Sequence, residues 1–240
     1  MKAVMSVVAM LALGGCASNG QTPWQALTAT ASCARLSDDQ QLSLSMADDM
    51  AAEGRLHASL ANLQRLPENL AQVRLSKAKA LRQLGRSEAE PLYRSLLGTC
   101  LGAEGEHGLG QLAMVRGDDS GALEHLRRAA RLSPTDEKIR NDLGVVFLNQ
   151  KRLQEARFEF LTAMELKPSD TLAASNLVTL LIYQDNWKQA SELVTRAGLS
   201  PEQVADAQSR AEQLKKPERA VPTASSDRVA GLDSTAGDVK

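Results

Sequence analysis

The sequence predicts an all-α protein. Long runs rich in Ala, Leu, Glu, Gln and Arg favour helix through the centre of the chain. Valine and isoleucine do not alternate with polar residues over any stretch long enough to make a strand. Residues of the same kind also recur at a constant spacing, which indicates a repeated helical unit.

The spacing of this repeat is 34 residues. A Leu-Gly pair at 109–110 recurs at 143–144, and Leu-Val follows at 177–178 (143 − 109 and 177 − 143). Two sets of small residues keep the same register, namely Ala122, Ala156 and Ala190, and Ala129, Ala163 and Ala197. The period and the residue types resemble the tetratricopeptide repeat (TPR), a helix-turn-helix unit. The resemblance implies a solenoid of stacked helix pairs.

Five repeats are predicted, at about 37–67, 68–101, 103–136, 137–170 and 171–199. Small residues such as Gly144 and Ala156 are expected where the two helices of a repeat press together, and Phe160 fills the remaining space. The second repeat fits with a first helix near 73–84 and a turn and second helix over 85–97, if its turn lacks one residue. In the first repeat, helices over 38–53 and 55–66 flank Gly54.

A further helix follows the last repeat. Ser200, Pro201 and Gln203 form a capping-box pattern, which predicts a helix start. The segment 200–216 is expected to cover the open apolar edge of the last repeat. Residues 217–240 are rich in Pro, Ala, Ser, Thr, Asp and Gly, a composition typical of a disordered tail.

The amino terminus has the layout of an export signal. Lys2 precedes an apolar stretch over 4–13, which is shorter than the roughly 20 residues needed to span a bilayer. Leu13-Gly14-Gly15-Cys16 resembles the bacterial lipobox, which implies a signal peptide over 1–15 and acyl chains on Cys16. Residues 16–36 then form a tether, and Ala17 after the cysteine implies an outer-membrane anchor facing the periplasm. An ordinary secreted protein with a stray cysteine is the alternative.

Two cysteines remain, Cys33 and Cys100. An even number of cysteines in an oxidising compartment favours a disulfide, and two separate buried thiols are the alternative.

The composition and the motifs argue against a nucleic-acid-binding, metal-binding or catalytic protein. A formal charge of −1 provides no basic excess for nucleic acid. His57, His107 and His125 fall on different repeats without metal-ligand spacing, and no phosphate loop or catalytic motif is present. We therefore expect no catalytic residue, metal or cofactor, and a protein that is not an enzyme.

The TPR resemblance implies a concave partner groove at the second, fifth, ninth, twelfth and thirteenth residues of each repeat. In the third repeat these are Glu104, His107, Gln111, Met114 and Val115. In the fourth they are Lys138, Asn141, Val145, Leu148 and Asn149, and in the fifth Leu172, Ser175, Thr179, Ile182 and Tyr183. This apolar and amide-rich lining favours the apolar face of a partner helix. The alternative is that some of these residues, Leu148 and Ile182 above all, belong to the core between repeats.

A lipobox, about five TPR units, the trailing helix AGLSPEQVADAQ and a polar tail together resemble the TadD-type lipoproteins of the tight-adherence (Flp) pilus system. The resemblance implies a monomeric, pilotin-like protein that binds a secretin segment and assists its localisation or assembly. Two alternatives stay open. One is a type IV pilus pilotin of similar architecture, and the other is a lipoprotein activator or regulator of a peptidoglycan or polysaccharide enzyme.

Overall fold

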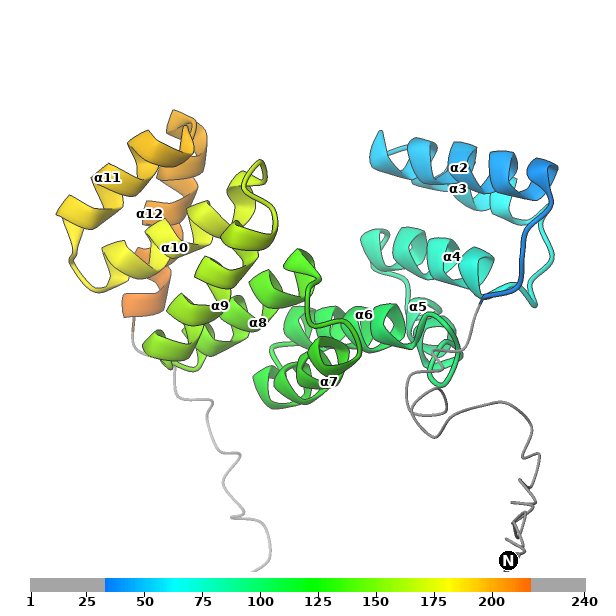
Figure 1. Cartoon of the computed structure of the whole chain (residues 1–240), viewed down its shortest axis with the longest axis horizontal. Coiled ribbons are helices and arrows are strands. Elements are labelled where there is room, and N and C mark those ends of the chain that lie inside the picture. Colours follow the sequence, from blue (N-terminus) through cyan, green and yellow to red (C-terminus); the bar gives the residue numbers. More distant parts are fainter. Residues whose placement is uncertain (1–32, 217–240) are drawn as a thin grey trace, which may run out of the picture. The chain divides into compact units, whose positions relative to one another are not determined.

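The computed structural model describes residues 33–216, which form eleven helices and no strand (Figure 1). The predicted all-α class is therefore confirmed. The chain divides into two compact units at Leu166 and Lys167. They are described separately.

The first compact unit contains four consecutive helix pairs (Figure 1). They are α2 (Asp38–Ala52) with α3 (Leu56–Leu63), α4 (Ala71–Gln83) with α5 (Ala89–Arg94), α6 (Gly102–Val115) with α7 (Asp119–Leu132), and α8 (Glu137–Asn149) with α9 (Leu153–Leu166). Each pair coincides with one repeat expected from the sequence, except that α6 begins at Gly102, one residue before the predicted third repeat.

The turn inside a repeat uses one left-handed residue. Gly117 has a φ of 73°, a conformation that glycine adopts without steric cost. Lys151 and Asp185 stand at the same position of the next two repeats (151 − 117 and 185 − 151, each 34) and have φ values of 61° and 57°. Glycine is therefore dispensable at this turn, where the backbone geometry of the helix pair determines the conformation.

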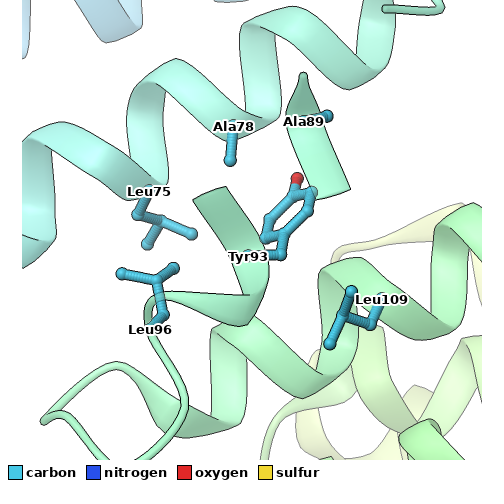
Figure 2. Packing of buried hydrophobic residues seen from close by; sticks show 6 residues of the cluster. All are labelled: Leu75, Ala78, Ala89, Tyr93, Leu96 and Leu109. Atoms are coloured by element: carbon cyan, nitrogen blue, oxygen red, sulfur yellow. The ribbon is translucent and has the colours of Figure 1, made fainter. Parts of the chain in front are cut away.

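Small residues let the helices approach closely. A Cβ atom at Gly144 would lie 2.5 Å from Phe160 Cδ1, so the close contact of α8 with α9 requires glycine there. Between repeats, a Cβ at Gly108 of α6 would overlap the ring of Tyr93 from α5. That ring lies in an apolar cluster with Leu75, Ala78, Ala89, Leu96 and Leu109 (Figure 2). The cluster joins the second repeat to the third.

Helix α5 is shorter than predicted, because it ends at Arg94 and not near residue 97. Ser95 Oγ donates a hydrogen bond to the Leu92 carbonyl (2.6 Å), and Thr99 Oγ1 donates one to the Leu96 carbonyl (2.6 Å). Gly98 then takes a φ of 76°. These local bonds replace the helical pattern and turn the chain toward Cys100.

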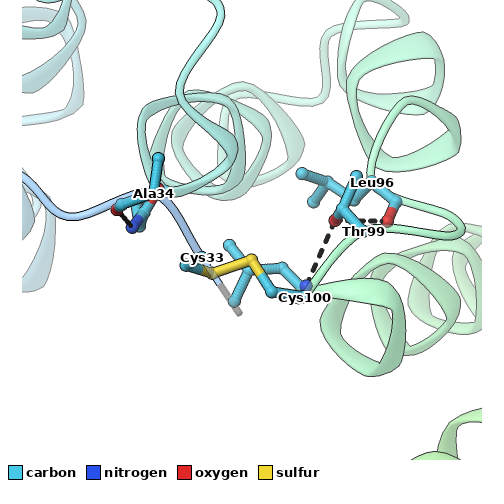
Figure 3. The surroundings of a disulfide bond; sticks show 7 residues. Cys33, Ala34, Leu96, Thr99 and Cys100 are labelled. Carbon is cyan, nitrogen blue, oxygen red and sulfur yellow. Dashed lines mark hydrogen bonds between the residues drawn. A yellow bond between two sulfur atoms is a disulfide. The ribbon is translucent and has the colours of Figure 1, made fainter. Parts of the chain in front are cut away.

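Cys33 and Cys100 form a disulfide with a Cα–Cα distance of 5.2 Å (Figure 3). The sequence left open a disulfide or two separate buried thiols, and the structure has the disulfide. Gln72 Nε2 donates a hydrogen bond to the Ala34 carbonyl (2.9 Å), which also holds the segment before α2 against α4. The segment before α2 is thereby attached to the beginning and the end of the second repeat.

The second compact unit contains α10 (Thr171–Tyr183), α11 (Trp187–Ala197) and α12 (Pro201–Lys215). The predicted capping box starts α12, since Gln203 N donates to Ser200 Oγ and Ser200 N donates to Gln203 Oε1. Helix α12 packs on α10, where Gln203 Nε2 donates to Thr171 Oγ1 (2.8 Å) and Arg210 Nη1 donates to Asn176 Oδ1 (3.0 Å). The expected terminal helix is therefore present.

Several expectations concern residues outside those that the structure describes. They are the signal peptide over 1–15, the acylated Cys16, most of the tether over 16–36 and the tail over 217–240. Among residues 33–216, no helix has the length and apolar character needed to cross a bilayer.

Candidate protein-binding groove

The first helices of three successive repeats, α4, α6 and α8, contribute to a hollow of about 350 Å³ within the first compact unit. We call it the α4–α6–α8 hollow. Its lining consists of Lys79, Arg82, Gln83, Tyr93, Glu104, His107, Gly108, Gln111, Asp136 and Lys138. Of the residues expected in a partner groove, the structure brings Glu104, His107, Gln111 and Lys138 together here.

The α4 side of this hollow was absent from the expected groove. Lys79, Arg82 and Gln83 stand 32 residues before the expected groove residues of α6 (111 − 79, 114 − 82 and 115 − 83). They occupy the same helix positions in the second repeat, whose turn is shorter. Applied to the predicted repeat at 68–101, the groove positions would have found Lys79 alone, because Arg82 and Gln83 take the twelfth and thirteenth positions only if that repeat starts at residue 71.

A largely buried carboxylate, Asp142, holds α6 against α8. Asp142 Oδ2 lies 2.8 Å from His107 Nε2 and accepts a hydrogen bond from Gln111 Nε2 (2.9 Å), while Asn141 Nδ2 donates to Oδ1 (3.2 Å). Burial raises the pKa of Asp142, but the bonds from His107, Gln111 and Asn141 outweigh it and lower that pKa below its usual value. The carboxylate is therefore a fixed negative charge that orients two lining residues.

The surface of the hollow is polar. Lys79 and Lys138 are exposed, and neither has an ion-pair partner among residues 33–216. Arg82 Nε donates to the Tyr93 hydroxyl at 3.4 Å. Asp136 is engaged at the start of α8, where its Oδ1 accepts from the backbone N–H groups of Lys138 and Ile139. The available side chains are thus amides and cations, with Glu104 as the one lining carboxylate not bonded within the described residues.

Five of the expected groove residues are buried, which corrects the predicted apolar lining. Their exposed fractions are 4% for Asn141, 6% for Val145, 0% for Leu148, 1% for Thr179 and 4% for Ile182. The reason is that each helix is buried on more than one face: six consecutive residues, 143–148, are buried in α8, and seven, 176–182, in α10. Groove positions derived from one helix face therefore fall inside the core here.

The remaining expected residues do not line the hollow. Val115 is 81% exposed and Met114 is half-buried at the end of α6. Asn149 Nδ2 donates to Asp119 Oδ1 (3.3 Å), so its amide joins α8 to α7. Ser175 and Tyr183 are half-buried and Leu172 is 53% exposed, all in the second compact unit.

The histidines of α6 and α7 have carboxylate partners. His125 Nδ1 lies 2.7 Å from Glu106 Oε2, and His107 is paired with Asp142 as described above. No group of three or more His, Cys, Asp or Glu side chains among residues 33–216 is placed to hold a metal ion.

Known structures share the fold of this chain. A structure determined for the functional characterization of Pseudomonas aeruginosa pilF has a TM-score of 0.57 at 16% identity, over 73% of this chain and 88% of that one. MamA of Desulfovibrio magneticus RS-1 (residues 41 to the end) has a TM-score of 0.52 at 18% identity, over 72% of this chain and 99% of that one. At these identities the likeness concerns the fold.

Sequence similarity is stronger to one curated protein. The chain is 42% identical over 207 residues to TPR repeat-containing protein PA4299 of Pseudomonas aeruginosa, covering 84% of this chain and 83% of that protein. No protein-family model matches the chain. The stacked helix pairs and this relative together establish that the chain belongs to the TPR repeat-containing proteins.

Proposed function

We propose that this chain is an outer-membrane lipoprotein that binds a secretin segment and assists its localisation or assembly in Flp (Tad) pilus biogenesis. The observation that carries the proposal is the α4–α6–α8 hollow, because it is built from equivalent faces of three successive TPR repeats. Repeat solenoids present such faces to a partner polypeptide. The link to the Flp system depends on the TadD-like layout of lipobox, repeats and tail.

Export and anchoring have separate support. Disulfides are rare in cytosolic proteins and persist in oxidising compartments such as the periplasm, and Cys33 is bonded to Cys100. That bond leaves Cys16, the third cysteine of the chain, for acylation at the lipobox. Two or more acyl chains give stable membrane attachment without a spanning helix.

The polar lining changes the segment that we expect to bind. Lys79, Arg82 and Lys138 favour a segment that carries carboxylates, and Gln83 and Gln111 can hydrogen-bond to an extended backbone. The proposed secretin segment is therefore polar and acidic. The apolar helix expected from Val145 and Leu148 is replaced, because those side chains lie in the core.

Charge reversal in the hollow tests the binding. The mature chain with Cys16→Ser, which keeps it free of lipid, is titrated with the periplasmic region of the Flp secretin from the same organism. Lys79→Glu combined with Lys138→Glu is expected to weaken binding by about 10-fold or more, as like charges replace attraction. The matched control, Arg86→Glu with Lys188→Glu, reverses two exposed charges outside the hollow and is expected to bind like the parent. Equal affinities of all three proteins would refute the groove.

Lipid attachment is tested in cells. Labelled palmitate should be incorporated by the parent and not by Cys16→Ser, and the parent should co-sediment with outer-membrane vesicles. Loss of the gene should reduce the amount of secretin multimer in that membrane. An unlabelled parent or an unchanged secretin multimer would contradict the corresponding part of the proposal.

A further inference from the structure

A second hollow, of about 490 Å³, lies between α4 and α5 in the first compact unit. We call it the α4–α5 hollow. Its lining consists of four aliphatic residues (Val73, Leu81, Pro91 and Leu92), two cations (Arg74 and Lys77) and two carboxylates (Glu68 and Glu88). Its volume falls in the range of about 300–1,000 Å³ usual for ligand sites in proteins.

This hollow uses a different face of α4 from the α4–α6–α8 hollow. Arg74, Lys77 and Leu81 are spaced by three and four residues and so share one helix face. Lys79, Arg82 and Gln83 share another, centred about 160° away at 100° for each residue. A partner bound at one hollow therefore leaves the other accessible on α4.

Arg74 is the unusual residue of the α4–α5 hollow. Its Nε atom is buried and has no hydrogen-bond acceptor among residues 33–216. Its side chain also makes no ion pair in this part of the chain. A guanidinium has five N–H donors and stays charged, so a buried donor without an acceptor is costly to the fold.

The two carboxylates of the lining bond to groups other than Arg74. Glu68 Oε1 accepts a hydrogen bond from Lys77 Nζ at 2.6 Å, and Glu88 Oε2 accepts one from Ser87 Oγ at 3.3 Å. The hollow therefore combines an aliphatic wall with a cation whose acceptor is missing. A carboxylate fits this cation best, because it can accept two parallel hydrogen bonds from a guanidinium.

We propose that the α4–α5 hollow binds a segment of a partner protein that places an aliphatic side chain against Leu81 and Leu92 and a carboxylate on Arg74. Charge complementarity selects this occupant. The preceding residues 1–32 contain no Asp or Glu, so the segment joined to the repeats through Cys33 carries no side-chain carboxylate for Arg74. The site is independent of the α4–α6–α8 hollow, and either assignment can fail alone.

Two blocked peptides serve as probes. They are Ac-Gly-Leu-Glu-Ala-Leu-Gly-NH₂ and the same peptide with Gln in place of Glu, each titrated into ¹⁵N-labelled mature chain with Cys16→Ser. The readout is the set of arginine Nε–H resonances, in which Arg74 is identified by its loss in Arg74→Gln. The Glu peptide should shift that resonance saturably and bind about 10-fold more tightly than the Gln peptide, the effect of one charge-assisted hydrogen bond.

Variants separate recognition from folding. Arg74→Gln should bind both peptides equally, whereas Arg86→Gln, an exposed arginine outside the hollow, should behave like the parent. Arg74→Lys keeps the charge without the planar fork and should retain part of the preference for the Glu peptide over the Gln peptide. This variant provides the test if Arg74→Gln does not fold. The Lys79→Glu and Lys138→Glu variant should respond like the parent.

Three results would overturn the proposal. One is an Arg74 resonance that the Glu peptide leaves unmoved, and another is equal affinity for the Glu and Gln peptides. The third is a shift of the same resonance on deletion of residues 217–240 without any peptide, because the chain's own tail would then be the occupant.

Discussion

His107 of α6 and Asp142 of α8 are joined at 2.8 Å between Nε2 and Oδ2, with side chains only 14% and 15% exposed. The two residues are 35 positions apart and belong to successive repeats. Gln111 donates to the same carboxylate oxygen from the next turn of α6. One acidic side chain therefore fixes the relative position of two helices that line the α4–α6–α8 hollow.

Replacing Asp142 by Asn should lower the free energy of unfolding at neutral pH. The change removes a charge that accepts bonds from His107 and Gln111, which predicts a loss of about 1.5–3 kcal/mol. Urea denaturation followed by circular dichroism measures the difference. Asp206→Asn, an exposed carboxylate on α12, is the matched control and should change stability by no more than about 0.5 kcal/mol.

The stabilising effect of Asp142 should depend on pH in the acid range. Its pKa in the folded protein is lowered from 3.8, so the folded state favours the ionised form. Its contribution is fully present above that value and is lost as the pH falls through the lowered pKa. The stability gap between the parent and Asp142→Asn should hold from pH 7 to pH 5 and narrow below pH 3.8. A gap that widens on acidification would contradict this direction.

Gly144→Ala should destabilise the fourth repeat by about 1–3 kcal/mol, because the new Cβ would lie 2.5 Å from Phe160 Cδ1. Thermal unfolding measures this loss. Gly102→Ala is a control of the same chemistry, since a Cβ there has its nearest neighbour at 3.8 Å. The control should be neutral or slightly stabilising, as alanine favours helix over glycine.

Removing the disulfide with Cys33→Ser and Cys100→Ser should cost about 4 kcal/mol in the chain-entropy account of a cross-link that spans 67 residues. Amide hydrogen exchange should accelerate most in α2–α5, which lie inside the closed loop. Exchange in α10–α12 should stay unchanged, because those helices lie outside it. Uniform acceleration in all helices would contradict a local role of the cross-link.

Leu148→Ala distinguishes core from groove at a residue expected to line the groove. The side chain is 0% exposed, so truncation should cost about 2–5 kcal/mol of stability. Lys138→Ala, at an exposed position of the same helix, should change stability by about 0.5 kcal/mol or less. If Leu148→Ala were nearly as stable as the parent, Leu148 would belong to the surface and not to the core.

The sequence by itself determined the helix pairs and their order. The 34-residue period, the small residue at Gly144 and the capping box at Ser200 and Gln203 are signals carried within one or two helices. Such local signals depend on backbone conformation and on contacts between neighbours in sequence. The helix pairs, the all-α class and the terminal helix α12 could therefore be predicted, but the early end of α5 at Arg94 could not.

Only the tertiary structure decided which residues remain on the surface and which polar groups meet. Val145 and Leu148 occupy groove positions on their helix, yet the neighbours that surround α8 bury them. The His107–Asp142 bond joins residues 35 positions apart, and the buried Nε atom of Arg74 is left without an acceptor by the packing around it. Burial and hydrogen bonding depend on what packs against every side of a helix. The pattern along one helix shows which residues share a face, but not which faces other helices cover.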